Sequence, residues 1–107
     1  MKTIKKSDMS EIIALSKFKP VILIFGSGSC PACMSMKLAV FPFLEKLETI
    51  HTFYVDIEND EGLSDEFEVE YLPTALFIKD SKVIGVIEGA VSIIEIKEKI
   101  TEYFKGD

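Results

Sequence analysis

The sequence predicts an α/β fold with a mixed central β-sheet and helices on both of its faces, and three observations carry this prediction. Segments with helical spacing of apolar residues alternate with short apolar runs, as in sheets covered by helices. Residues 21–25 are continuously apolar, which is typical of a strand buried on both faces. Two later runs are separated only by residues 79–82, which predicts an antiparallel hairpin.

The segment before residues 21–25 predicts a short edge strand and one helix. We expect the strand at residues 2–5 and the helix at residues 8–16. Asp8 and Glu11 have the spacing of a capping box at the start of that helix. The helix would pack on the sheet through an apolar stripe made of Met9, Ile12, Ile13 and Leu15.

A longer helical pattern follows the central strand, from residue 30 to about residue 49. Pro42 lies inside it. Because proline has no N–H and clashes with the preceding turn, we expect a kink or an interruption near Phe41. The stripe expected to face the core across this break consists of Leu38, Phe41, Leu44 and Leu47.

The second half of the chain predicts the remaining elements. We expect, in order, a strand at residues 52–57, a polar loop at 58–62, a short helix at 63–67 and strands at 75–78 and 83–87. Ser92 and Glu95 form a capping box for a final helix that runs to about Phe104. The residues expected to face inward from this helix are Ile93, Ile96, Ile100 and Phe104.

Length, charge and hydropathy exclude several classes of function. The 107 residues have the size of one domain, which we expect to span residues 1–107. A formal net charge of −6 argues against nucleic-acid binding, which requires basic clusters. No apolar run approaches the length of a membrane span. Residues 1–6 lack the apolar core of a signal peptide, so we expect a cytoplasmic protein.

The chain has two cysteines, and both lie in the motif Cys30-Pro31-Ala32-Cys33. The motif follows the flexible residues 26–28 and precedes a helical pattern, so Cys30 is expected at a helix N-terminus. Two intervening residues place both thiols on one face of the first turn, close enough for a disulfide. Unpaired N–H groups and the helix dipole favour a thiolate there, so the pKa of Cys30 should fall. Pro31 suits the first helical position.

Other readings of these residues remain open. The cysteines could be core residues, or they could bind zinc with His51, although a zinc site needs four ligands. We expect no metal and no cofactor other than the cysteine pair itself. Glu58, Asp60 and Glu61 lack the ligand spacing of a calcium loop and are expected to be solvated.

The order of elements, the cysteine motif, residues 72–74 and the pair Gly89-Ala90 together resemble the thioredoxin family over nearly the whole chain. The resemblance implies the thioredoxin fold and a cis proline beside the active site, which Pro73 matches. The alternative is that Pro73 is an ordinary trans turn proline.

The resemblance implies a thiol-disulfide oxidoreductase that reduces protein disulfides. Cys30 would be the nucleophile and Cys33 the resolving cysteine. An apolar substrate surface would be formed by Leu72, Pro73, Pro31, Gly28 and Ala90. The implied partners are protein disulfides and an electron donor that resembles thioredoxin reductase, and we expect a monomer.

The sequence also departs from the family pattern. The usual Trp before the first cysteine is Ser29, and the buried Asp used for proton transfer is replaced by Ile24. The Lys near that Asp corresponds to Tyr54, and Asp56 or Glu58 could supply the missing acid. Two alternative functions therefore stay open. One is a disulfide oxidase or isomerase that uses the same cysteines, and the other is a redox-silent binding module on this fold.

Overall fold

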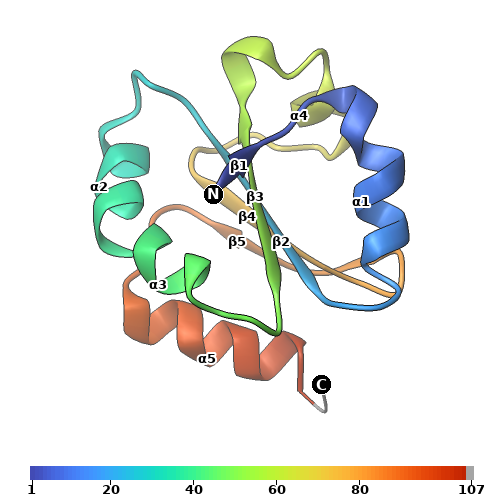
Figure 1. Ribbon diagram of the computed structural model, residues 1–107. Coiled ribbons are helices and arrows are strands. Elements are labelled where there is room, and N and C mark those ends of the chain that lie inside the picture. Colours follow the sequence, from blue (N-terminus) through green and yellow to red (C-terminus); the bar gives the residue numbers. More distant parts are fainter. Residues whose placement is uncertain (106–107) are drawn as a thin grey trace.

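The computed structural model describes residues 1–105 and contains a mixed sheet of five strands (Figure 1). The strands are β1 (Lys2–Thr3), β2 (Val21–Gly26), β3 (His51–Asp56), β4 (Thr74–Lys79) and β5 (Lys82–Glu88). The helices are α1 (Met9–Leu15), α2 (Pro31–Ala39), α3 (Phe41–Glu45), α4 (Leu63–Glu66) and α5 (Ile93–Tyr103), with 3-10 turns η1 (Lys6–Asp8) and η2 (Ile57–Asn59). None of the helices within residues 1–105 has the length and apolar character needed to cross a membrane.

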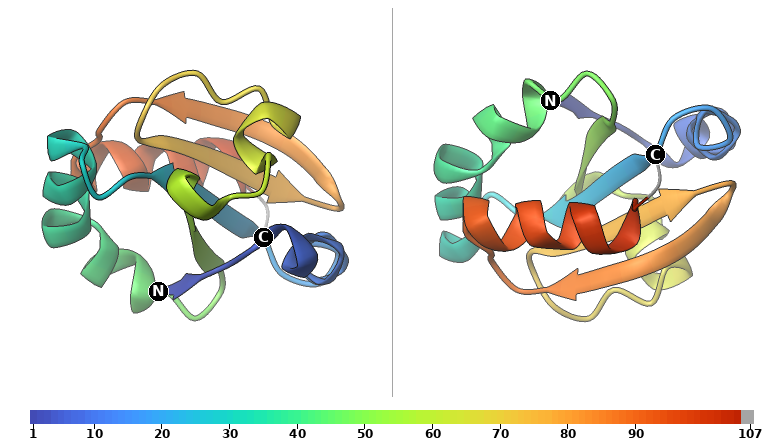
Figure 2. Two further views of the ribbon diagram at one scale, coloured as in Figure 1. Left: turned by 90° about the horizontal axis from the view of Figure 1, so that it is seen from above. Right: turned by 90° about the horizontal axis from the view of Figure 1, so that it is seen from below.

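The strands lie in the order β1-β3-β2-β4-β5. β1, β3 and β2 are parallel, whereas β4 runs antiparallel to β2 and β5 antiparallel to β4. Helices cover both faces of this sheet, with α1 and α4 on one side and α2, α3 and α5 on the other (Figures 1 and 2). The predicted fold class, a mixed sheet between helices, is therefore confirmed.

The central strand β2 divides the core into two clusters. Ile22 and Ile24 face the cluster that includes Met36 of α2 and Ile96 of α5. The alternate residues Val21, Leu23 and Phe25 face the opposite cluster, which the residues of α1 and α4 complete. All six residues of β2 are buried, as their apolar run predicts.

The N-terminal elements are shorter than expected, and the start of the first helix differs. β1 has only two residues, and a 3-10 turn precedes α1. The predicted capping box between Asp8 and Glu11 is wrong. The Asp8 carboxylate instead accepts the N–H of Lys5 at 2.9 Å and so caps the 3-10 turn. Met9 and Ile12 are buried as expected, whereas Ile13 and Leu15 are only half-buried.

The helical pattern after β2 is interrupted, as Pro42 predicts. α2 ends at Ala39 and α3 begins at Phe41, with Pro42 in its first turn. The change of direction alters which residues face inward. Phe41 and Leu44 are buried, but Leu38 is 80% exposed, so its predicted place in the core is wrong. The helical residues also end at Glu45 rather than near residue 49.

The C-terminal half follows the predicted order of elements. The hairpin turn places Asp80 and Ser81 at positive φ, and their N–H groups bond to the carbonyl and hydroxyl oxygens of Ser16. The capping box of Ser92 and Glu95 is present. Two expectations need correction. Ile57 belongs to η2 rather than to the strand, and Ile93 is 37% exposed because it lies in the first turn of α5.

Candidate active site

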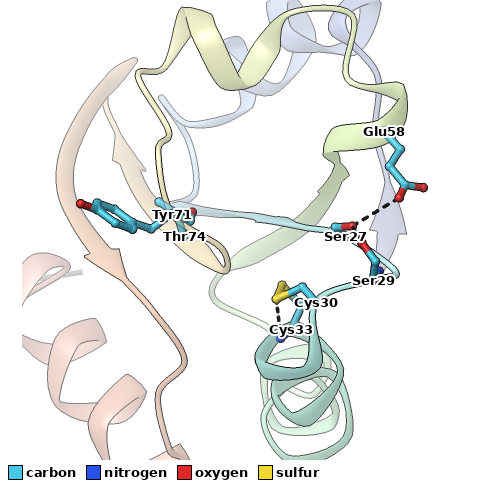
Figure 3. Close-up of a disulfide and its surroundings, with 7 residues drawn as sticks. All are labelled: Ser27, Ser29, Cys30, Cys33, Glu58, Tyr71 and Thr74. Carbon is cyan, nitrogen blue, oxygen red and sulfur yellow. Dashed lines mark hydrogen bonds between the residues drawn. A yellow bond between two sulfur atoms is a disulfide. The ribbon is translucent and has the colours of Figure 1, made fainter.

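The two cysteines lie where the chain leaves the sheet and enters α2. Cys30 is the N-cap of this helix, Pro31 is its first residue, and Cys33 lies in its first turn. Cys30 and Cys33 form a disulfide whose Cα atoms are 5.2 Å apart (Figure 3). The predicted pairing and its place at the helix N-terminus are therefore present in the structure.

The helix end supplies hydrogen-bond donors to the first cysteine. The backbone N–H of Cys33 donates to Sγ of Cys30 at 3.1 Å, and the N–H of Met34 donates to the Cys30 carbonyl at 3.1 Å. Cys30 is partly exposed, whereas Cys33 is only 2% exposed. An incoming molecule therefore reaches Cys30, and Cys33 is held beneath it. The N-terminus of α2 favours negative charge on the Cys30 sulfur.

A hydroxyl network holds the loop that leads to Cys30. The Ser27 side chain is 4% exposed, and its Oγ accepts the backbone N–H of Ser29 at 3.2 Å. The Ser27 hydroxyl also lies 3.0 Å from the Ser29 hydroxyl and donates to Glu58 Oε1 at 3.4 Å. Glu58 belongs to η2, so this contact links the cysteine loop to the segment after β3.

A second segment, residues 71–74 at the start of β4, borders the site. The Leu72–Pro73 peptide bond is cis, in agreement with the expectation for Pro73. The Pro73 carbonyl accepts the N–H of Gly89 at 2.7 Å, and the Thr74 hydroxyl donates to the Tyr71 carbonyl at 2.6 Å. Figure 3 shows Tyr71 and Thr74 on one side of the disulfide, with Ser27, Ser29 and Glu58 on the other.

The five residues predicted to bind substrate differ in exposure. Gly28, Pro31 and Ala90 are exposed, Leu72 is half-buried, and Pro73 is buried. A shallow groove of about 440 Å³ is lined by Tyr71, Leu72, Glu88 and Gly89. The structure thus joins Leu72 to the Gly89 turn, while Gly28 and Pro31 flank Cys30 along the chain.

Sequence reasoning missed three contributors to this region. The buried Ser27 hydroxyl orders a loop that the sequence presents only as flexible. Glu58, expected to be solvated or to supply the missing acid, contacts this hydroxyl, and Tyr71 is 60% exposed beside Leu72. A serine between two glycines after a buried strand was the available signal for Ser27.

Two of the positions that depart from the family pattern, Ile24 and Tyr54, are buried on adjacent strands. Ile24 is 1% exposed and pairs in register with Tyr54 of β3. Burial, together with the nearby charges of Asp56 and Glu58, raises the pKa of Tyr54. The Asp56 carboxylate accepts the N–H of Glu58 at 3.0 Å and so caps η2.

The alternative zinc site receives no support from the geometry. His51 begins β3 beside Val21, at the end of the sheet opposite to the cysteines. Burial and the charge of Lys19 lower the pKa of His51, whose ring stacks on Phe53. Within residues 1–105, no group of three or more His, Cys, Asp or Glu side chains is arranged to hold a metal ion. A larger hollow of about 720 Å³ contains neither cysteine and is lined by Thr3, Ile4, Lys5, Asp56, Glu58, Asn59 and Glu61.

Two relatives are similar to this chain in sequence. Thioredoxin-1 of Caenorhabditis elegans is 29% identical over 102 residues, which cover 92% of this chain and 84% of that protein. Thioredoxin H5 of Arabidopsis thaliana is 27% identical over 85 residues, which cover 79% of this chain and 71% of that protein.

Solved structures show the same fold. The X-ray structure of Fasciola hepatica thioredoxin matches with a TM-score of 0.87 and 23% identity, covering 96% of this chain and 99% of that one. Thioredoxin f from spinach chloroplast matches with a TM-score of 0.86 and 21% identity, covering 97% and 93%. The family model described as Thioredoxin matches residues 1–102, so the chain belongs to the thioredoxin family.

Proposed function

We propose that this protein reduces disulfides in other proteins by thiol-disulfide exchange. The observation that carries the proposal is the position of the cysteine pair: Cys30 is partly exposed at a helix N-terminus, and Cys33 is buried one turn behind it. This asymmetry gives the two sulfurs different tasks. One meets the substrate, and the other completes the exchange within the same chain.

The exchange has two steps. The Cys30 thiolate attacks one sulfur of the substrate disulfide, a bond forms between them, and the second substrate sulfur leaves as a thiolate that takes up a proton. The Cys33 thiolate then attacks Sγ of Cys30 and displaces the first substrate sulfur. The substrate gains two electrons, and the Cys30–Cys33 disulfide seen in the structure is the product.

The surface beside the disulfide supports a polypeptide substrate. Leu72 and Tyr71 offer apolar area in the shallow groove, and the small residues Gly28, Pro31 and Ala90 are exposed. We propose that Leu72 and Pro73 present backbone groups to an extended segment of the substrate. We further propose that the protein is a cytoplasmic monomer and that a donor similar to thioredoxin reductase reduces its disulfide again.

The reduction potential of the cysteine pair distinguishes this function from the oxidase alternative. We would equilibrate the protein in glutathione buffers and quantify the disulfide. A reduction potential of about −270 mV supports a reductase, whereas one of about −120 mV supports an oxidase. A protein that binds its partners equally well after both cysteines are replaced with serine would be a binding module instead.

A further inference from the structure

A single polar atom in the interior lacks a partner. Among the side chains of residues 1–105, the phenolic oxygen of Tyr54 is the one buried nitrogen or oxygen atom without a hydrogen bond. The Tyr54 side chain is 5% exposed, so water does not readily replace the missing partner. Native proteins rarely keep such a group, and its presence calls for an explanation.

The hydroxyl lies at the end of the sheet that leads to the disulfide. Tyr54 pairs with Ile24, but its side chain extends past that residue to Gly26, the last residue of β2. A Cβ placed on Gly26 would lie 2.6 Å from the Tyr54 oxygen, so the phenol occupies the space of a side chain at this position. Four residues beyond Gly26 the chain reaches Cys30.

α2 covers the same face of the sheet. Met36 of this helix belongs to the core cluster of Tyr54, and Nζ of Lys37 lies 4.4 Å from the centre of the Tyr54 ring. Cys33 precedes Lys37 by one helical turn and therefore shares its side of the helix. β2 ends at Gly26, which lies against the Tyr54 hydroxyl, and α2 begins at the disulfide a few residues later. The buried Cys33 and the Tyr54 hydroxyl therefore lie at the same end of the space between α2 and the sheet.

We propose that the Tyr54 hydroxyl donates a hydrogen bond to Sγ of Cys33 once the disulfide is reduced, and so stabilises the thiolate that resolves the mixed disulfide. This inference rests on the proposed function and concerns its second step. Cys33 loses its proton to solvent, and its thiolate attacks Sγ of Cys30. The bond between Cys30 and the substrate breaks, and the departing substrate thiolate takes up a proton from water. Tyr54 keeps its own proton throughout.

The surroundings keep Tyr54 a donor rather than a base. Burial, Asp56 and Glu58 raise its pKa, so the phenol is neutral when Cys33 ionises. Lys37 of α2 places a positive charge on the ring and favours a nearby thiolate. β2 contributes only apolar residues and glycine to this face, and Phe41 of α3 packs against the Tyr54 ring. The N-terminal amine is paired with Glu45 of α3. α5 carries Glu95, Lys97, Glu98, Lys99 and Glu102, of which Lys97 lies over the Phe43 ring.

Tyr54→Phe isolates the hydroxyl, because the ring keeps its contacts with Phe41 and Lys37. Reduced protein would be mixed with an excess of an aromatic disulfide whose leaving thiolate is coloured. The first release reports attack by Cys30 and the second reports resolution by Cys33. Tyr103→Phe is the matched control, since Tyr103 packs on Gly85 in the hairpin, away from the cysteines.

We expect the first release to be unchanged within about twofold. At about pH 7 the second release should be about three- to tenfold slower in Tyr54→Phe, because fewer Cys33 groups are ionised. The less stabilised Cys33 thiolate is also a better nucleophile, and this partly offsets the loss of rate. In Tyr54→Phe the midpoint of the pH profile of the second release should rise by about one unit. At high pH the rate of the second release should equal that of the wild type. Tyr103→Phe should follow the wild type.

Two results would overturn the inference. One is a second release with the wild-type rate and pH midpoint in Tyr54→Phe. The other is a second release that is slower by the same factor at every pH, which would indicate a purely structural effect. Urea unfolding of the oxidised variant shows that it is folded, and removal of the unpaired hydroxyl should leave its stability equal or higher. If wild-type protein shows no second release, the proposed function fails and this inference fails with it.

Discussion

The backbone N–H of Cys33 points at the sulfur of Cys30, with 3.1 Å between nitrogen and sulfur. This contact makes Cys30 the N-cap of α2, a position that usually belongs to an oxygen-bearing side chain. After reduction the same N–H remains directed at the Cys30 sulfur. A thiolate accepts such a hydrogen bond better than a thiol, so the local backbone favours the reactive form of this cysteine.

The first prediction concerns the difference between the two thiols. In reduced protein at about pH 7, an alkylating reagent should label Cys30 at least about tenfold faster than Cys33, because Cys30 is both reachable and stabilised as a thiolate. Peptide mapping by mass spectrometry after short exposures measures both rates. Cys33→Ser should keep the fast labelling and Cys30→Ser should lose it. Equal rates in the wild type would contradict the assignment of the nucleophile.

The second prediction concerns the loop before Cys30. Ser27→Ala removes the hydroxyl that accepts the Ser29 N–H and contacts Glu58, and it leaves these groups without that partner. We expect the free energy of unfolding to fall by about 1–2 kcal/mol, as measured in urea. Ser29→Ala is the control, because the Ser29 side chain is exposed and its loss should cost less. Equal effects of the two variants would show that the buried hydroxyl does not order the loop.

The third prediction concerns the close approach of Gly26 and Tyr54. Gly26→Ala introduces a Cβ that would meet the phenolic oxygen at 2.6 Å and two ring carbons at 3.0 and 3.1 Å. We expect a loss of about 1–3 kcal/mol in the free energy of unfolding. Tyr54→Phe in the same chain removes the closest atom but not the ring carbons, so it should restore part of the loss. A double-mutant cycle with additive effects would show that the two residues do not compete for space.

The fourth prediction concerns Asp60 and acid stability. Burial alone would raise the pKa of Asp60, but hydrogen bonds from Ser64 and Gly62 outweigh it and hold the pKa below its ordinary value. A lowered pKa in the folded state means that ionised Asp60 stabilises the fold above its unfolded pKa, and that this contribution disappears as the pH falls through the folded pKa.

Asp60→Asn should therefore lower the free energy of unfolding by about 1–2 kcal/mol near neutral pH and by less in acid. Urea titrations at several pH values between about 7 and 3 measure this difference. Asp65→Asn in α4, the short helix that follows Asp60, is the control, since the Asp65 side chain is exposed. A difference between wild type and Asp60→Asn that does not change with pH would refute the electrostatic explanation.

The architecture and the cysteine pair could be predicted because their signals are local. An apolar run such as residues 21–25 has few ways to bury both of its faces, and Pro42 cannot lie in the interior of a regular helix, so one helix ends before it and another begins with it in the first turn. The position of Cys30 follows in the same way from a strand, a glycine-containing loop and a helix start. Short-range steric and hydrogen-bonding requirements determined these features.

The failed predictions share a different cause. Leu38 has the helical spacing of Phe41 and Leu44, yet it belongs to α2, whose buried residues Cys33 and Met36 lie on the opposite side of that helix. Asp8 has the spacing of a helix cap, but the backbone forms a 3-10 turn and its carboxylate bonds to Lys5 instead. In both cases the direction of a neighbouring segment, which no local pattern encodes, decided the outcome.

Local sequence patterns are enough to place the strands and helices along the chain and to put the Cys30–Cys33 motif at the start of a helix. The contact of Glu58 with the Ser27 hydroxyl and the place of the Tyr54 phenol beside Gly26 follow instead from the packing of distant segments. These contacts join segments about thirty residues apart along the chain. They arise because β2 pairs with β3 and α2 packs on one face of the sheet, and packing of this kind depends on the whole fold rather than on any single stretch of residues.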